Sequence, residues 1–300
     1  MTRAQSEALS RMLREGPLDL GGEPAVQRPL LDGLLTAHPL PDDVRTSDGV
    51  LSGVPVVEVE HADGAHGTVL FFHGGAYAIG SARGAAGMLA EIVTRTGVRG
   101  ISVEYRLAPE HPYPAAVHDA LAAYRGLLDQ GVAPGSIVVA GESAGGGLAL
   151  ALLLAARAAG LPQPAAAFVF SPWADLTLSG STLGSKAEQD PALSSAALRT
   201  RAADYLAGSD PADPLVSPAL ADLTGLPPLL LQCGSAEILL ADALRLAVRA
   251  AEADIAVELA VTPHAPHVFQ GFPAVVDEAV VALDDAAAFV SRHLHGAARP

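Results

Sequence analysis

One serine of this sequence lies between glycines in a pattern that could make it a nucleophile. Gly141, Ser143 and Gly145 match G-x-S-x-G, in which a strand turns so tightly into a helix that no side chain fits beside the serine. Such a turn exposes the serine hydroxyl, which can then attack a carbonyl carbon. The pattern also arises by chance in chains rich in glycine, so its meaning depends on its surroundings.

Two adjacent glycines could stabilise the negative charge that such an attack creates. Gly74 and Gly75 follow an apolar stretch, residues 67–72, and side chains do not shield their amides. Both N–H groups, together with the amide of Ala144, could hold a developing oxyanion. A Gly-Gly pair after a strand is also ordinary in turns, so this assignment depends on the serine motif.

A nucleophilic serine also needs a base, and the sequence offers two candidates. The histidines that follow Ser143 are His264, His267, His293 and His295. The last two lie at the C-terminal end, which leaves His264 and His267 in a loop after an expected strand. We choose His267 because the local sequence Pro-His-Val-Phe places it beside aromatic packing; His264 is the alternative. This pair lacks cysteine or carboxylate partners at a ligand spacing, so no metal site is expected.

The elements that must position these residues alternate between strands and helices. Apolar runs predict strands at residues 54–60, 67–72, 100–105, 136–141, 166–171, 229–234 and 256–262. Helices are expected at residues 115–130, 144–159, 239–253 and 274–294. Apolar strands that alternate with helices form a mostly parallel sheet with helices on both faces. The sequence therefore predicts an α/β fold whose sheet begins at residue 54.

Two segments interrupt this alternation and are expected to form a helical cap. Residues 1–45 contain helical fragments broken by glycine and proline, and residues 178–215 contain one helix-like stretch, 192–207. An insertion at the carboxyl ends of consecutive strands lies where a lid over the site would be. The catalytic core is therefore expected to cover residues 46–177 and 216–300.

The composition indicates a globular protein and excludes several classes of partner. Of the 300 residues, 50% are hydrophobic and 17% are charged, as in globular chains. The net charge of −15 argues against binding to nucleic acid or anionic membranes, which attract positively charged surfaces. The apolar stretch 144–156 is too short to span a bilayer, and charges interrupt the first residues before a signal peptide could form. We therefore expect a cytoplasmic protein without an internal disulfide, since Cys233 is the only cysteine.

Five longer motifs occur in order along residues 54–272. They are HGGA from His73, YRLAPEHPYPAA from Tyr105, GESAGG from Gly141, SPWADLT from Ser171 and PHVF from Pro266. With these motifs the sequence resembles the bacterial hormone-sensitive-lipase-like (family IV) carboxylesterases of the α/β-hydrolase fold. The resemblance implies an α/β-hydrolase with a helical cap that hydrolyses carboxylic esters without a cofactor.

The resemblance also implies roles for individual residues. The nucleophile would be Ser143, the base His267, and the oxyanion donors Gly74, Gly75 and Ala144. The substrate is expected to bind near His73, Ala76, Tyr77 and Glu142. The family often has HGGG and GDSAG where Ala76 and Glu142 stand here, but two glycines and an acidic neighbour of the serine are kept.

The acid that orients His267 is expected to be Glu237. The family's usual Asp-Pro-Leu-x-Asp is replaced by Ala-Glu-Ile-Leu-Leu-Ala-Asp at residues 236–242. Glu237 lies just past the strand 229–234, on the loop where this fold delivers its acid, and the fold accepts either acid. Asp242 falls within the following helix, where a hydrogen bond at the helix start is its expected role. Asp242 remains the alternative acid.

These inferences predict a serine carboxylesterase that hydrolyses short-chain acyl esters through an acyl-enzyme intermediate. The same residues could instead cleave a lactone or an N-acyl amide. A non-catalytic small-molecule receptor on this fold should lack one of the three reactive side chains, whereas a serine, a histidine and a candidate acid are all present. A homodimer through an edge strand is common in proteins of this kind, and we expect it here.

Overall fold

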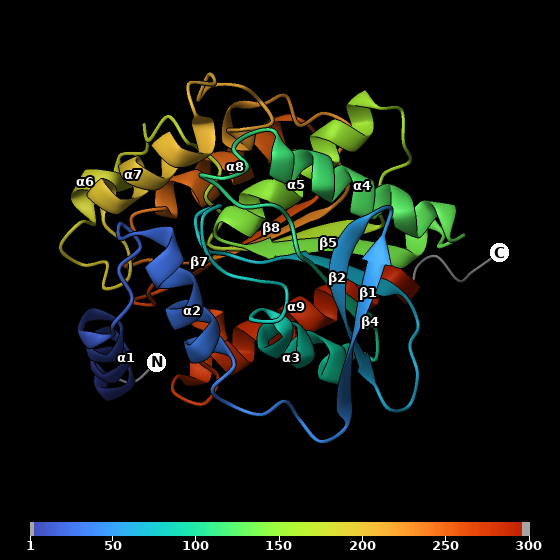
Figure 1. Cartoon of the computed structure of the whole chain (residues 1–300), viewed down its shortest axis with the longest axis horizontal. Coiled ribbons are helices and arrows are strands. Elements are labelled where there is room, and N and C mark those ends of the chain that lie inside the picture. The colour runs from blue at the N-terminus through green and yellow to red at the C-terminus, as the bar shows by residue number, and fades with distance from the viewer. Residues whose placement is uncertain (1–2, 296–300) are drawn as a thin grey trace.

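An eight-stranded sheet forms the centre of the protein, whose computed structural model describes residues 3–295 (Figure 1). The strands lie in the order β1-β2-β4-β3-β5-β6-β7-β8. Their bounds are β1 Val44–Leu51, β2 Val54–His61, β3 Thr68–Phe72, β4 Arg99–Val103, β5 Ile137–Glu142, β6 Ala166–Phe170, β7 Leu229–Gly234 and β8 Val257–Thr262. Strands β3 to β8 are parallel, whereas β2 pairs antiparallel with both of its neighbours. The α/β fold with a mostly parallel sheet is confirmed.

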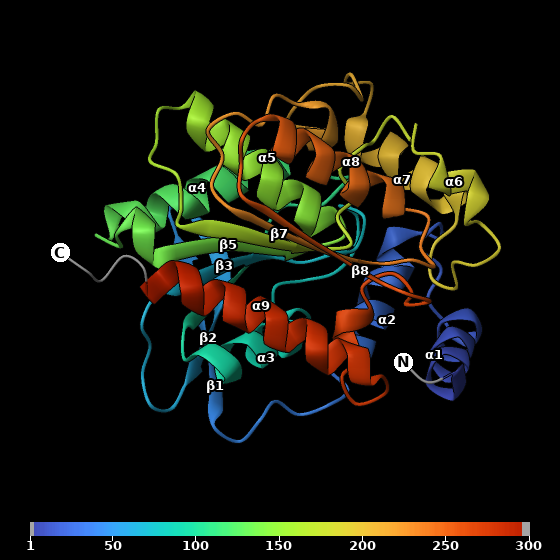
Figure 2. The same cartoon turned by 180° about the vertical axis from the view of Figure 1, so that it is seen from behind.

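Helices cover both faces of this sheet (Figures 1 and 2). On one face lie α3 (Ala86–Thr96) and α9 (Asp277–His295), and on the other lie α4 (Ala115–Asp129), α5 (Ala144–Ala158) and α8 (Leu240–Glu252). Successive side chains of a strand point to opposite faces, so Leu70 of β3 packs in the core with α5 and Phe71 packs in the core with α3 and α9. Both faces of the central strands are thus buried, which explains their continuous apolar runs.

Helix α5 is the most deeply buried helix of the described chain and begins directly after Ser143. Its residues from Ala144 to Ala156 are all buried between the sheet and α4. A helix enclosed on all sides can be apolar all round, so its apolar sequence reflects burial in protein. No helix within residues 3–295 is both long enough and apolar enough to cross a membrane.

The sheet begins ten residues earlier than expected, and neither α3 nor the four-residue α6 (Thr182–Ser185) was expected. Strand β1 starts at Val44 instead of residue 54, and most of its residues are exposed because it pairs only with β2 at the edge. Only its end residues Val44 and Leu51 are buried, so its sequence lacks the apolar alternation that reveals a strand. Helix α3 has no capping side chain at its start; the packing of Leu89 and Val93 in the core stabilises it instead.

The helices outside this core gather at one end of the sheet (Figure 1). They are α1 Arg3–Glu15, α2 Pro24–Leu35, α6 Thr182–Ser185 and α7 Ser195–Leu206, and short 3-10 helices lie at Pro134–Ser136, Pro218–Leu220 and Phe269–Gly271. The two distant segments touch: the Arg14 Nη2 donates to the Glu188 carbonyl at 2.9 Å, and the Arg201 Nη1 donates to the Gly22 carbonyl at 3.2 Å. Residues near the N-terminus and residues of the 178–215 insertion are therefore in contact, although they are far apart in the sequence.

Candidate active site

The tight turn at Ser143 joins β5 to α5 in a strained conformation that its neighbours make possible. Ser143 has a φ of 53° and a ψ of −122°, a combination that non-glycine residues rarely adopt. A Cβ atom on Gly145 would lie 2.0 Å from the Phe72 carbonyl oxygen, and one on Gly141 would lie 2.3 Å from that of Gly145. Only glycine fits at either position, so the two flanking glycines are required by close approach of the backbone.

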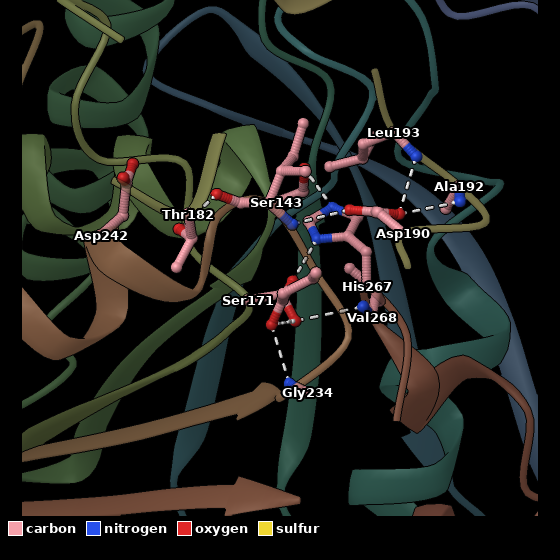
Figure 3. Close-up of polar contacts among 12 residues, drawn as sticks. Ser143, Ser171, Thr182, Asp190, Ala192, Leu193, Gly234, Asp242, His267 and Val268 are labelled. Atoms are coloured by element: carbon pink, nitrogen blue, oxygen red, sulfur yellow. Dashed lines mark hydrogen bonds and ion pairs between the residues drawn. The ribbon is translucent and has the colours of Figure 1, made fainter. Parts of the chain in front are cut away.

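A chain of hydrogen bonds connects Ser143 to a buried carboxylate through His267 (Figure 3). The Ser143 Oγ lies 2.9 Å from the His267 Nε2, and the His267 Nδ1 lies 2.6 Å from the Glu237 Oε2. A carboxylate only accepts hydrogen bonds, so the Nδ1 carries the proton and the Nε2 is free to accept from the serine hydroxyl. The other oxygen of Glu237 accepts from the Gly234 amide at 2.7 Å and from the Ser171 hydroxyl at 3.1 Å.

The charges around the imidazole favour its protonated form. Burial by itself lowers the pKa of His267, but the hydrogen bond to Glu237 and the negative charges of Glu237, Asp190 and Glu142 raise the pKa above its ordinary value. A base with a raised pKa accepts a proton more readily from a hydroxyl. The arrangement therefore suits proton transfer from Ser143 to His267.

Backbone amides beside Ser143 are arranged so that they could bind an anion. Gly75 has a φ of +113°, and a Cβ atom there would lie 2.1 Å from the Ile79 carbonyl oxygen. Within residues 3–295 the amides of Gly75 and Ala144 have no hydrogen-bond acceptor, and the latter is the first amide of α5, where the helix dipole favours negative charge. The amide of Gly74 donates to the Glu142 Oε1 at 3.3 Å. The free amides next to Ser143 can stabilise an oxyanion.

Comparison with known proteins assigns this geometry to a family. Residues 69–271 match the family described as alpha/beta hydrolase fold. An acetyl-hydrolase of Streptomyces hygroscopicus is 46% identical over 223 residues, which cover 74% of this chain and 75% of that protein. An esterase of Acinetobacter venetianus is 37% identical over 287 residues, which cover 95% of each chain.

A solved structure extends the similarity to the whole fold. The crystal structure of an esterase from the bacterial hormone-sensitive lipase family superposes with a TM-score of 0.94 at 38% identity, covering 98% of this chain and 99% of that one. The chain belongs to the bacterial hormone-sensitive lipase family of α/β hydrolases. The expected family is confirmed, and the protein is a carboxylic ester hydrolase.

The two alternative site residues lie elsewhere in this esterase. Asp242 is in the first turn of α8, apart from His267 (Figure 3), and its Oδ2 accepts the amides of Ala174 and Asp175 at 2.9 Å each. Burial raises the pKa of Asp242 to about 7. His264 is exposed, and its backbone amide donates to the Ser235 hydroxyl. The structure therefore brings Glu237 and His267, and neither alternative, to Ser143.

The residues expected near the substrate make most of their contacts within the esterase itself. The buried ring of His73 stacks on Tyr105 at 4.2 Å, and its Nδ1 donates to the Gly74 carbonyl at 2.7 Å. Burial lowers the pKa of His73 to about 4, so its ring is neutral at pH 7. Tyr77 stacks on Tyr205 of α7 at 3.9 Å. Ala76 is also buried, so these three residues support the glycine loop, whereas Glu142 bonds to the Gly74 amide.

Sequence reasoning missed two buried residues next to the hydrogen-bonded chain. The Ser171 hydroxyl donates to Glu237 and accepts from the Val268 amide at 3.1 Å. Asp190 is one of the charges that raise the pKa of His267. Ser171 begins the SPWADLT motif, which was noticed only as a family signature, and Asp190 belongs to an Asp-Pro pair that is ordinary in loops. Only the fold brings these residues to the site.

Proposed function

We propose that the enzyme hydrolyses short-chain acyl esters through an acyl-enzyme on Ser143, with His267 as base and Glu237 as the acid that orients it. The unbroken hydrogen-bonded chain from Ser143 to Glu237 carries this proposal. Nucleophile, base and orienting acid in this order are the arrangement that activates serine in hydrolases on several unrelated folds.

Acylation begins when the Ser143 Oγ attacks the ester carbonyl carbon while the His267 Nε2 takes the hydroxyl proton. The carbonyl oxygen becomes an oxyanion, which accepts hydrogen bonds from the amides of Gly75 and Ala144. The Gly74 amide, the third donor expected from the sequence, would have to leave the Glu142 Oε1 to join them. The tetrahedral intermediate collapses as the His267 Nε2 returns the proton to the leaving alkoxide. An alcohol departs, and the acyl group stays on Ser143.

Deacylation repeats these steps with water as the nucleophile. His267 takes a proton from the water molecule, whose oxygen attacks the acyl carbon, and then returns the proton to the Ser143 oxygen as the carboxylic acid leaves. Glu237 stays ionised and holds the Nδ1 proton of the imidazole in both halves of the reaction. In each half of the reaction His267 takes up one proton and gives it back, so the free enzyme is regenerated.

In this proposal the cap covers the substrate-binding side of the site. We assign the segments 1–45 and 178–215 to the cap, except for residues 44 and 45, which begin β1, because the two segments contact each other at the same end of the sheet. That end carries the loops after β3, β5 and β7, which hold the glycine pair, Ser143 and Glu237. A cap at the carboxyl ends of parallel strands controls access to such a site.

The preference for short acyl chains rests on the relatives. The Streptomyces hygroscopicus relative is named an acetyl-hydrolase, which supports a small acyl group here. That name leaves open whether acetyl leaves an oxygen or a nitrogen, so an N-acetyl amide is the second candidate substrate.

A hydrolysis panel tests the proposal. Purified enzyme is given p-nitrophenyl esters from acetyl to palmitoyl, an N-acetyl-p-nitroanilide, a γ-lactone and an emulsified long-chain triglyceride. We expect the highest kcat/KM for the acetyl to hexanoyl esters. Faster hydrolysis of the triglyceride than of the butyryl ester would overturn the short-chain preference. Faster hydrolysis of the anilide or the lactone than of the esters would show that the preferred substrate is an amide or a lactone.

A further inference from the structure

A buried carboxylate of the 178–215 insertion lies beside the hydrogen-bonded chain without being part of it. Asp190 is only 3% exposed. Its Oδ1 accepts the amides of Ala192 and Leu193 at 2.8 and 2.9 Å, and its Oδ2 accepts the amide of Ile238 at 2.8 Å (Figure 3). No lysine or arginine among residues 3–295 forms an ion pair with Asp190. Its negative charge is thus held by backbone amides alone.

A carboxylate buried without a cation costs stability that a neutral side chain would not. Three N–H donors offset part of that cost, since hydrogen bonds to a charged acceptor are stronger than neutral ones. The group that gains from the charge is His267, because Asp190 is among the anions that raise its pKa. The other charged groups facing His267 are Glu237, from the loop after β7, and Glu142, at the end of β5. Carboxylates from three parts of the chain thus favour the protonated imidazole.

The insertion also holds the backbone directly after Glu237. While the Asp190 carboxylate accepts the Ile238 amide, the Thr182 hydroxyl donates to the Ile238 carbonyl at 2.7 Å and accepts the Ala241 amide at 2.9 Å. Both polar backbone groups of Ile238 are therefore bonded to side chains of the insertion. Glutamate has one more rotatable bond than aspartate and therefore more conformations to lose when it is held in place. A fixed backbone reduces these conformations and helps to keep the Glu237 carboxylate 2.6 Å from the His267 Nδ1.

We propose that Asp190 is a positioning residue for the catalytic base, acting in two ways. Through the Ile238 amide it fixes the loop that carries Glu237, and through its charge it stabilises the imidazolium that forms when His267 takes the proton of Ser143. This inference rests on the proposed function. It makes the insertion part of the catalytic machinery in addition to a boundary of the substrate site.

Two variants separate the charge of Asp190 from its structural contact. Asp190→Asn removes the charge and replaces one acceptor oxygen with an NH₂ group, whereas Thr182→Val removes a neutral contact to the same residue, Ile238. Each variant is measured for kcat and KM with p-nitrophenyl acetate, for the pH dependence of kcat/KM, and for thermal unfolding. The acid limb of the pH profile reports the pKa of His267 in the free enzyme.

For Asp190→Asn we expect kcat to fall by about 10- to 100-fold, with KM changed less than about threefold, because the base is affected and substrate binding is not. The acid limb should move to lower pH by about half a unit or more, since a nearby anion no longer favours the imidazolium. For Thr182→Val we expect a smaller loss of kcat and an unmoved acid limb. A merely structural role of Asp190 would lower stability and activity without moving the limb, and that result would overturn the proposal.

A further variant keeps the inference testable if Asp190→Asn does not fold. Asp190→Glu retains the charge and displaces the carboxylate, so we expect a lowered kcat with the acid limb close to that of the wild type; full kcat in this variant would overturn the positioning role. Ser143→Ala is measured in parallel. Remaining hydrolysis by Ser143→Ala would mean that the proposed function fails, whereas an inactive Ser143→Ala beside an unmoved limb in Asp190→Asn would refute this inference alone.

Discussion

Glu237 has a longer side chain than an aspartate, so more contacts are needed to hold its carboxylate in one place. One oxygen reaches the His267 Nδ1, and the other is fixed by the Gly234 amide and the Ser171 hydroxyl. Both oxygens are thus bonded in a fully buried position, which limits the carboxylate to one orientation. The sequence alone could place Glu237 in the loop after β7, but it could not predict the hydrogen bond to Ser171, which follows a different strand, β6.

Substitutions of Glu237 and Asp242 test which of the two carboxylates orients His267. Glu237→Gln should lower kcat by about 10⁴-fold, because a neutral amide no longer holds the imidazole in the required tautomer. Asp242→Asn is the matched control: its carboxylate bonds to the amides of Ala174 and Asp175, so it should cost less than about tenfold in kcat. Both are measured with p-nitrophenyl butyrate at matched fractions of folded protein. A large loss confined to Asp242→Asn would assign the acid to Asp242.

The pH dependence of activity follows from the raised pKa of His267. The base must be neutral to accept the Ser143 proton, so a raised pKa means that activity falls on acidification from a higher pH than the ordinary histidine value of about 6.5. His73, whose pKa burial lowers to about 4, should add no step above pH 5. The profile of kcat/KM between pH 5 and 9 checks this, and an acid limb centred below about 6 would contradict the assigned electrostatics.

At the scale of elements, the central strands were predictable and the edge was not. Strand β7 lies where its apolar run predicts it, β3, β6 and β8 differ from expectation by one residue at one end, and β5 differs by one residue at each end. Burial of both faces leaves a strong apolar signal in these strands. Strand β1 and helix α3 lacked such signals. Their positions depend on tertiary contacts, with β2 for the strand and with the core for the helix.

The glycine loop after β3 provides a test at this scale. Gly75→Ala should lower both kcat and the unfolding midpoint, because a Cβ atom would lie 2.1 Å from the Ile79 carbonyl oxygen and φ is +113°. A displaced Gly75 amide can no longer donate to the oxyanion, and the loss of one such donor typically lowers kcat by about 10²-fold or more. Gly87→Ala in α3 is the control, since nothing lies within 4 Å of its added Cβ and alanine favours helices. Full kcat in Gly75→Ala with a lowered midpoint would leave the loop a purely structural role.

At the scale of the whole molecule, helix α1 contacts two segments that carry residues of the site. Leu9 of α1 is fully buried in a cluster with Ala265 and Phe269, which flank the loop of His267. Arg14 of the same helix donates to the Glu188 carbonyl, just before Asp190. The sequence indicated helical fragments in this region, but only the folded chain shows that they pack beside the base.

Leu9→Ala tests this connection. The change should destabilise the enzyme by about 2–4 kcal/mol, the usual cost of a cavity from a buried leucine, and should lower kcat more than it raises KM because the His267 loop loses packing. Met12→Ala on the same helix, where the side chain is 45% exposed, should change stability by less than about 1 kcal/mol. Urea unfolding and steady-state kinetics measure both effects. Equal stability of the two variants would show that α1 does not pack as described.

The covalent intermediate on Ser143 is the claim on which the mechanism depends. The most direct measurement mixes enzyme with p-nitrophenyl acetate, quenches the reaction in acid within milliseconds and locates the added acetyl group by mass spectrometry of proteolytic peptides. We expect at most one acetyl group per chain, on the peptide that contains Ser143, and none in Ser143→Ala, which should also lose hydrolysis. Hydrolysis by Ser143→Ala at more than a few per cent of the wild-type rate, with an unchanged unfolding midpoint, would contradict the mechanism.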